Sequence, residues 1–356
     1  MVGLGGREGG RRTGGRLAGR GSRCSRRAFL GLAAGGAAAL ADLSGCGETP
    51  GTSIINVSYD PTREFYEAYN SLFADHWRQL SGVDVEVTDT HGGSGKQALE
   101  VANGLPADVV TLALAPDIDS LVGEGLVRDG WQDALPNDSA PYTSTIVFVV
   151  RAGNPKGIAD WGDLARDGVG VITPNPKTSG GARWNYLAAW AWAERGGGGE
   201  DEVKDFMRRL YANVLVLDSG ARASTTTFVE NGQGDVLVAW ENEAYLSVRD
   251  DPGAFQIVTP SVSILAQPPV AVVDEIVDER GTRDVATEYL RFLYEPDAQR
   301  LAAQNYYRPV DEGVFAEFQG QFDQLDLATI QDFGGWAQAQ QEHFSDGGTF
   351  DEIYGG

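Results

Sequence analysis

Strand-like and helix-like segments alternate along most of this chain, and this alternation constrains its fold more than any other feature. Between the strand-like runs, apolar residues such as Phe65, Tyr69 and Phe73 recur at the spacing of one helix face. Such alternation is typical of βαβ units, so the sequence predicts an α/β protein with mostly parallel sheets. The strand-like runs stand at residues 54–59, 83–88, 107–115, 146–150, 169–173, 214–218, 235–240 and 255–259.

Two extended segments, residues 142–151 and 264–273, divide this pattern into lobes. About 110 residues with their own α/β pattern lie between them. This indicates one lobe inserted into another through two hinge strands. We expect a first lobe at residues 54–143 and 264–310, a second lobe at 144–263, and C-terminal helices at 311–356 that the pattern assigns to neither lobe.

The first 53 residues predict export and a lipid anchor. The motif S-R-R-A-F-L at residues 25–30 resembles a twin-arginine export signal, and L-S-G-C at residues 43–46 resembles a lipobox. The apolar stretch between them is shorter than the roughly 20 residues that span a bilayer, which is typical of a signal peptide. We expect a signal peptide at residues 1–45, a linker at 46–53, and Cys46 lipidated on the outer face of the cell membrane or in the periplasm. A degraded transmembrane anchor is the alternative.

The charge changes sign at the end of this leader. Residues 1–45 carry eight arginines and two acids, so the remaining chain has 20 basic and 49 acidic residues and a formal net charge of −29. Only four lysines occur in the whole chain. This acid-rich and lysine-poor composition resembles that of proteins from extreme halophiles. The alternative is an ordinary acidic protein. A negative field of this size argues against nucleic acid as a partner.

Four turns combine small residues with the start of a predicted helix. The first turn of a helix has unsatisfied N–H groups and a partial positive charge, and small residues let a ligand approach the backbone closely. Several such turns converging on one cleft would form an anion site without lysine or arginine. The alternative is that each is an ordinary βα connection. The turns are Tyr59-Asp60-Pro61, Gly92-Gly93-Ser94-Gly95, Thr178-Ser179-Gly180-Gly181 and Ser219-Gly220-Ala221.

Residue types that carry catalysis are sparse. His76, His91 and His343 do not have metal-ligand spacing, and no G-x-S-x-G nucleophile motif occurs. The glycine-rich turn before Gln97 is not a nucleotide-binding loop, because a serine or threonine is needed at that position to bind magnesium. Trp240 ends a predicted strand, and its indole is either a core group or a hydrogen-bond donor that faces a cleft. The sequence therefore predicts a binding protein without cofactor or metal, and not an enzyme.

Eight short segments, spread in order along nearly the whole of residues 54–354, form a further pattern. They are NVSYDPT (56–62), HGGSGKQ (91–97), ADVVTLALA (107–115), DSAPYTSTIVF (138–148), VITPNPKTSGGARWNYLAA (171–189), DSGAR (218–222), DVLVAWENE (235–243) and GGTFD (347–351). This pattern resembles the prokaryotic sulfate-binding proteins of ABC importers. The chain departs from the family at Ala223-Ser224, where Gly-Ala is usual.

The resemblance implies a two-lobed periplasmic-binding-protein fold of type II, in which each lobe is a mostly parallel sheet flanked by helices. It also implies that a dehydrated sulfate is held in the cleft by neutral donors. Thiosulfate-preferring relatives lack an indole at the position of Trp240, so the resemblance favours sulfate. The implied donors are the backbone N–H groups of Asp60, Ser94, Gly180, Gly181 and Ala221, the hydroxyl of Ser179 and the indole N–H of Trp240.

The function implied by the resemblance is sulfate capture for an ABC importer. The lobes would close on the anion, and the closed monomer would dock on a membrane permease whose ATPase subunit drives import. One alternative is the same fold tuned to thiosulfate, molybdate or tungstate. The others are a sulfate-ester hydrolase, for which no nucleophile and base are suitably spaced, and a sensor that signals to a receptor.

Overall fold

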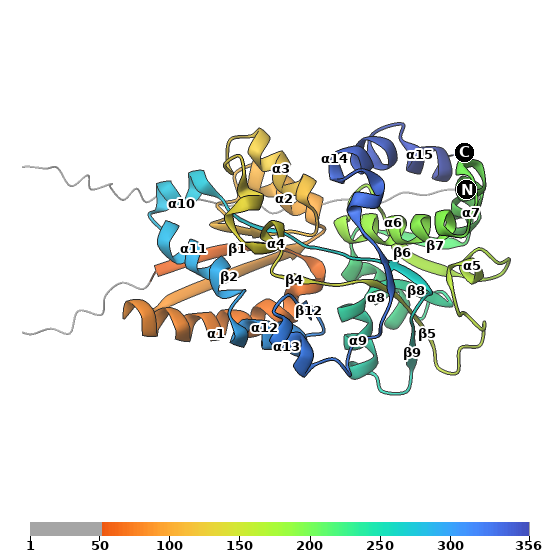
Figure 1. Ribbon diagram of the computed structural model, residues 1–356, viewed down its shortest axis with the longest axis horizontal. Coiled ribbons are helices and arrows are strands. Elements are labelled where there is room, and N and C mark those ends of the chain that lie inside the picture. The colour runs from red at the N-terminus through yellow and green to blue at the C-terminus, as the bar shows by residue number, and fades with distance from the viewer. Residues whose placement is uncertain (1–51, 356) are drawn as a thin grey trace, which may run out of the picture. The chain divides into compact units, whose positions relative to one another are not determined.

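The computed structural model describes residues 52–355 (Figure 1). The predicted signal peptide, most of the linker and the lipidation site Cys46 lie outside the described residues. The described residues form one compact unit, within which two separate sheets define two lobes. No helix within residues 52–355 has both the length and the apolar character needed to cross a bilayer.

The sheet of the first lobe has the strand order β11-β3-β1-β2. Strand β1 (Thr52–Tyr59) is its parallel centre, flanked by β2 (Val85–Gly92) and β3 (Val109–Thr111), while β11 (Val270–Val272) runs antiparallel beside β3. The helices of this lobe are η1 (Asp60–Thr62), α1 (Arg63–Ser81), α2 (Ser94–Ala102), α3 (Ala115–Gly123), η2 (Trp131–Ala134), α4 (Pro136–Ser139), α10 (Asp274–Arg280), α11 (Arg283–Phe292), α12 (Pro296–Gln304) and α13 (Glu312–Glu317).

Helix α1 forms where the apolar spacing predicts it. Phe65, Tyr69 and Phe73 lie on one face of the helix, are almost fully buried, and pack with Tyr289 of α11. The helix ends at Gly82, whose φ of 74° is left-handed and whose N–H donates to the carbonyl of Arg78. Glycine adopts this conformation without the steric penalty that a Cβ atom brings, so the stop is encoded locally.

The sheet of the second lobe has the order β7-β6-β8-β5-β9. Strands β6, β7 and β8 are parallel, whereas β5 runs antiparallel to both β8 and β9. The α/β class with mostly parallel pairing is confirmed, with the hinge-connected β5 and β11 as the antiparallel members. The elements are β5 (Ile146–Arg151), α5 (Trp161–Leu164), β6 (Val171–Pro174), α6 (Gly180–Arg195), α7 (Glu200–Ala212), β7 (Val214–Asp218), α8 (Ala221–Val229), β8 (Val236–Trp240), α9 (Glu241–Asp250) and β9 (Phe255–Val258).

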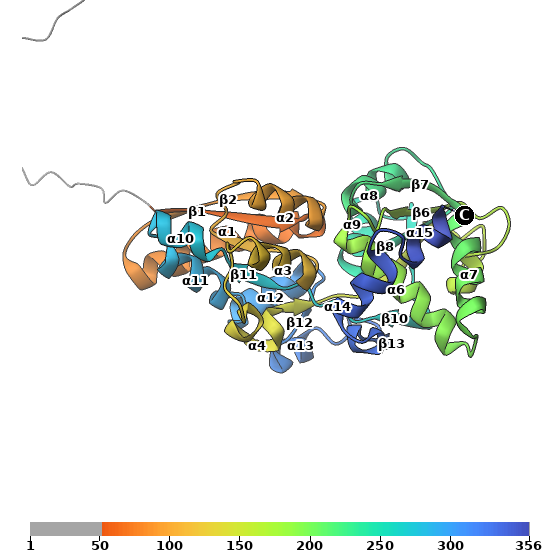
Figure 2. The same cartoon turned by 90° about the horizontal axis from the view of Figure 1, so that it is seen from above.

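Three segments of chain cross between the lobes. The first joins β4 (Tyr142–Thr143), which pairs with β12 (Arg308–Pro309), to β5. The second joins β10 (Val262–Ile264) to β11. A third, which the sequence pattern did not indicate, runs from α13 to β13 (Asp326–Ala328), and β13 pairs in parallel with β10. The chain therefore returns to the second lobe at its C-terminal end (Figure 2).

The C-terminal segment packs into the core of the second lobe. Phe344, Phe350 and Ile353 belong to the same buried cluster as Tyr186 of α6 and Tyr211 of α7. Aromatic edge-to-face contacts join Phe350 to Tyr211 at 5.3 Å between ring centres, so this segment is part of the second lobe. Its elements are η3 (Ile330–Phe333), α14 (Trp336–Ala339), η4 (Gln340–Phe344) and α15 (Thr349–Tyr354).

Candidate functional site

The structure brings the four small-residue turns together between the lobes. Two of them follow β1 and β2 of the first lobe, and two precede α6 and α8 of the second. Together they line a small cavity. None of its lining residues is a lysine, arginine or histidine. They are Tyr59, Asp60, Pro61, Gly92, Gly93, Ser94, Ser179, Gly181 and Ala221.

Each candidate donor stands at the end of an element. Ser94 and Ala221 are the first residues of α2 and α8, and Ser179 is the N-cap of α6. Gly180 and Gly181 open α6, Asp60 opens η1, and Trp240 is the last residue of β8. The first N–H groups of a helix have no partner within the helix and carry its positive partial charge. Of the seven candidate donors, Gly180 and Trp240 do not line the cavity, whereas the other five do.

Ser94 shows how a side chain leaves its backbone free for a ligand. Its hydroxyl donates to the carboxylate of Asp117 and accepts from the N–H of Ala113 at 2.9 Å. The hydroxyl is thus engaged on the side of α3, and Ser94 is 1% exposed. Of the two groups on this residue, the backbone N–H is the one available to an anion.

At Ser179, the side-chain hydroxyl is the group that remains available to a ligand. Its side-chain oxygen accepts from the N–H of Ala182 at 3.3 Å, which caps the start of α6. An oxygen that accepts in this way keeps its own proton for another acceptor. The Ser179 hydroxyl can therefore cap the helix and donate to a ligand at the same time.

The glycines at the start of α6 are required by close packing between the lobes. A Cβ atom on Gly180 would lie 2.9 Å from Cβ of Ala113 and 3.0 Å from Cβ of Ser94, both in the first lobe. A Cβ atom on Gly181 would lie 3.0 Å from Nε1 of Trp240. Larger residues at these two positions would hold the lobes apart or displace the indole.

Trp240 is almost fully buried, and its donor edge faces the start of α6. Its side chain is 1% exposed, and its ring lies 5.3 Å from that of Tyr59. The indole Nε1 is 3.3 Å from the carbonyl oxygen of Gly181, at the long end of the hydrogen-bond range. The ring is therefore a core group, and Trp240 is not among the residues that line the cavity, so its role as a ligand donor stays a prediction.

Asp60 does not cap the first helix with its side chain. Asp60 is the first residue of η1, the N-cap is Tyr59, and no side chain caps that turn. The carboxylate of Asp60 lies instead beside Gly220, where an added Cβ atom would come within 2.2 Å of Oδ2. Burial raises the pKa of Asp60, and the nearby cations Arg63 and Arg222 oppose that rise.

Gly93 and Gly220 are functional positions to which the sequence reasoning assigned no role. A Cβ atom on Gly93 would lie 2.7 Å from the carbonyl oxygen of Thr178, which belongs to the opposite lobe. Both glycines stand inside turns that the sequence singled out. The presence of glycine rather than another small residue was the available signal.

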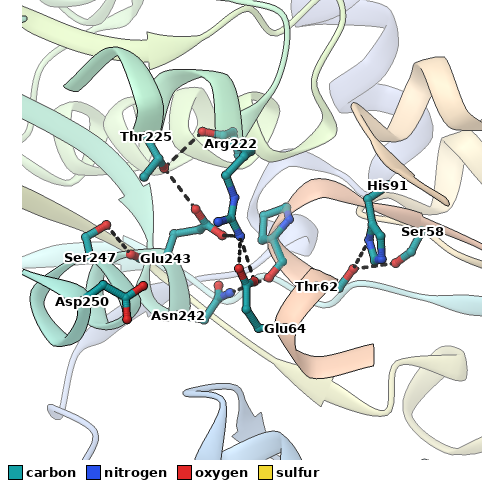
Figure 3. A network of polar contacts seen from close by, with 12 residues as sticks. Ser58, Thr62, Glu64, His91, Arg222, Thr225, Asn242, Glu243, Ser247 and Asp250 are labelled. Carbon is teal, nitrogen blue, oxygen red and sulfur yellow. Dashed lines mark hydrogen bonds and ion pairs between the residues drawn. The ribbon is translucent and has the colours of Figure 1, made fainter. Parts of the chain in front are cut away.

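A network of charged side chains joins the lobes beside the cavity (Figure 3). Arg222 of α8 donates to both carboxylate oxygens of Glu64 of α1 at 2.8 Å, and to Glu243 of α9 at 3.1 Å. Asn242 adds a bond to the carbonyl of Pro61 at 2.9 Å. Burial raises the pKa of Glu243 to about 7, against the lowering effect of Arg222. These contacts hold the start of α8 against the first lobe.

Glu241 forms a second buried ion pair. Its carboxylate receives two bonds from Arg308 of β12, at 2.7 and 2.8 Å. Burial raises the pKa of Glu241, and Arg308 opposes this rise. Glu241 does not line the cavity, so Asp60 is the carboxylate that does.

The described residues contain no cluster of three or more His, Cys, Asp or Glu side chains that could hold a metal. His76 pairs with Glu288 at 2.8 Å, and His343 contacts the hydroxyl of Tyr186 at 3.2 Å. His91 lies below the cavity, 3.4 Å from the carbonyl of Tyr59, and burial lowers its pKa to about 4. It is therefore uncharged at neutral pH and adds no cation to the site.

Two α/β lobes joined by crossover strands, with a cavity of neutral donors between them, define a two-lobed solute-binding protein. Residues 62–308 match the family described as bacterial extracellular solute-binding protein. The sulfate-binding protein of Escherichia coli is 58% identical over 303 residues, covering 84% of this chain and 92% of that protein. The thiosulfate-binding protein of Pseudomonas aeruginosa is 47% identical over 327 residues, covering 91% and 96%.

A solved structure shows the same arrangement. The sulfate-binding protein SubI from Mycobacterium tuberculosis superposes with a TM-score of 0.76 at 38% identity, covering 83% of this chain and all of that one. The chain belongs to the prokaryotic sulfate-binding proteins within the bacterial extracellular solute-binding family. The predicted fold and family are confirmed, as is the prediction of a binding protein rather than an enzyme.

Proposed function

We propose that this protein captures sulfate in the cavity between its lobes and delivers it to an ABC importer. The observation that carries this proposal is the cavity itself, in which backbone N–H groups from several helix starts surround a space without any basic side chain. Such groups suit a fully deprotonated anion that presents only acceptors. The names of the relatives, which include sulfate-binding and thiosulfate-binding proteins, support the same class of ligand.

In this proposal the seven donors act together. Backbone N–H groups would come from Asp60 and Ser94 in the first lobe and from Gly180, Gly181 and Ala221 in the second, and all of these except Gly180 line the cavity. The hydroxyl of Ser179 and the indole N–H of Trp240 complete the set. Because the donors come from both lobes, the anion would favour the closed state through contacts that only that state offers. The closed monomer would then dock on a permease, where reopening releases sulfate to ATP-driven import.

Thiosulfate is the second candidate ligand, favoured by the 47% identity to a thiosulfate-binding relative. Molybdate and tungstate are the remaining candidates for the same fold. A titration calorimetry series with sulfate, thiosulfate, molybdate and phosphate tests the proposal. Binding of none of the sulfur oxyanions would refute it.

We also propose that the chain is exported by the twin-arginine route and anchored through Cys46. The support is the pair of motifs in the correct order around an apolar stretch. Replacement Cys46→Ser is expected to abolish anchoring, because the thiol is the site of lipid attachment. Cell fractionation should find the variant in the medium or as unprocessed precursor. Normal processing and membrane retention of the variant would contradict the proposal.

The acidic surface supports adaptation to high salt as a further proposal. With a net charge of −29 after residue 45, repulsion between carboxylates should destabilise the fold at low ionic strength. The melting temperature of residues 48–356 is expected to rise by several degrees between dilute and molar NaCl, as the Debye length falls to about 3 Å. Sodium sulfate is unsuitable, because a bound ligand also raises the melting temperature. A flat profile would argue for an ordinary acidic protein.

A further inference from the structure

A second, wider pocket adjoins the small cavity, and we call it the mouth. Asp60, Gly92 and Gly93 line both the mouth and the cavity. The charged side chains that line the mouth are Lys96, Lys177, Arg222 and Asp60. Three of these four are cations, whereas the chain as a whole has 28 basic and 51 acidic residues.

The positions of the lysines strengthen this contrast between the basic mouth and the acidic chain. The chain contains only four lysines, namely Lys96, Lys156, Lys177 and Lys204. Two of the four line the mouth. A protein with this net charge repels a dianion at long range, so cations at the entrance have a clear physical use.

The three cations differ in how strongly they are held. Lys177 is bound to Asp351 at 2.8 Å and to two backbone carbonyls, with its side chain 26% exposed. Arg222 is shared between Glu64 and Glu243. Lys96 is the most exposed, at 69% of its side chain, and its partner is Glu100 one helical turn away at 3.6 Å.

We propose that the basic side chains of the mouth, with Lys96 as the exposed member, form a steering site that draws the dianionic oxyanion toward the cavity. This inference rests on the proposed sulfate capture and adds a role for residues outside the donor set. Lys96 lines the mouth and not the inner cavity. It therefore acts on the encounter with the anion and not on the bound complex. Such attraction raises the association rate and is screened by salt.

The test is the association rate of sulfate, followed by stopped-flow tryptophan fluorescence at the lowest NaCl concentration at which the protein is folded. Lys96→Gln is expected to slow association about two- to fivefold with an unchanged dissociation rate. Glu100→Gln removes an acid beside Lys96 and should change the rate in the opposite direction. Both effects should vanish at 1 M NaCl, where the Debye length is about 3 Å.

Lys156→Gln is the matched control. Lys156 is also partly exposed, at 42% of its side chain, and has one carboxylate partner, Asp235 at 3.5 Å, but it does not line the mouth. Equal association rates for Lys96→Gln and Lys156→Gln at low salt would overturn the steering role. A change confined to the dissociation rate of Lys96→Gln would also overturn it, because Lys96 would then contact the bound anion. If the unchanged protein does not bind sulfate, the proposed function falls, and this inference falls with it.

Discussion

Sulfate is expected to bind this protein about 10⁴-fold more tightly than phosphate at neutral pH. Sulfate is fully deprotonated there and presents only acceptors, whereas phosphate carries one or two protons. A phosphate O–H placed among N–H and O–H donors would lose its hydrogen bond in a cavity without water. A site that leaves a buried polar group unpaired in this way discriminates by about 10⁴–10⁵.

Competition calorimetry at pH 6, 7 and 8 would measure this selectivity. Phosphate keeps at least one proton over this range, so its exclusion should persist, and sulfate affinity should stay flat. Displacement of sulfate by phosphate at comparable concentration would contradict a cavity made only of donors. Asp60→Asn is the informative variant, because Asp60 is the carboxylate that lines the cavity. If phosphate binds the unchanged protein, loss of that binding in Asp60→Asn would identify the acceptor.

Replacement Trp240→Phe is expected to weaken sulfate binding about 10- to 150-fold with little loss of stability. The phenyl ring keeps most of the packing against Tyr59, whose ring lies 5.3 Å away. It removes the indole N–H that faces the start of α6. A hydrogen bond to a charged group contributes about 1.5–3 kcal/mol, which corresponds to this loss of affinity. Calorimetric titration with sulfate and thermal unfolding of the same variant are the two measurements.

Trp161→Phe provides the matched control. Trp161 is equally buried in the second lobe, but its indole N–H donates to the carbonyl of Val262 at 2.8 Å and not to the start of α6. Loss of that buried bond should lower the melting temperature and leave sulfate affinity unchanged. Unchanged affinity in Trp240→Phe would show that Trp240 is a core residue alone.

The local sequence pattern placed several strands to within a few residues. The run 214–218 coincides with β7, and 146–150 falls one residue short of β5. The errors lie at strand ends whose position depends on pairing with a neighbouring strand. The apolar run 107–115 contains only the short strand β3 (Val109–Thr111), because pairing with β1 and β11 covers only those residues. Strand β2 extends to Gly92, beyond the predicted end at residue 88, because it stays paired with β1 to that point.

The four turns were readable from the sequence because helix starts and glycines are local signals. Their convergence was a hypothesis, since no local pattern states which turns share a cleft. The resemblance to a family named the donors, but physical reasoning from the residues alone left each turn open to an ordinary structural role. The tertiary structure supplied the missing element, which is the proximity of turns that belong to different lobes and lie more than 80 residues apart in the chain.

By itself the sequence determined the α/β class, the helix stops such as Gly82 and the positions of the donor-bearing turns, because these depend on side-chain spacing and on the conformational freedom of glycine. Only the tertiary structure decided the rest. It turned the carboxylate of Asp60 toward Gly220 instead of capping its own helix, and it paired Arg222 with Glu64 across 158 residues. It also placed two of the four lysines at the cavity mouth. These features depend on how the two lobes pack against each other. Contacts between residues far apart in the chain leave no periodic pattern in the sequence of either lobe.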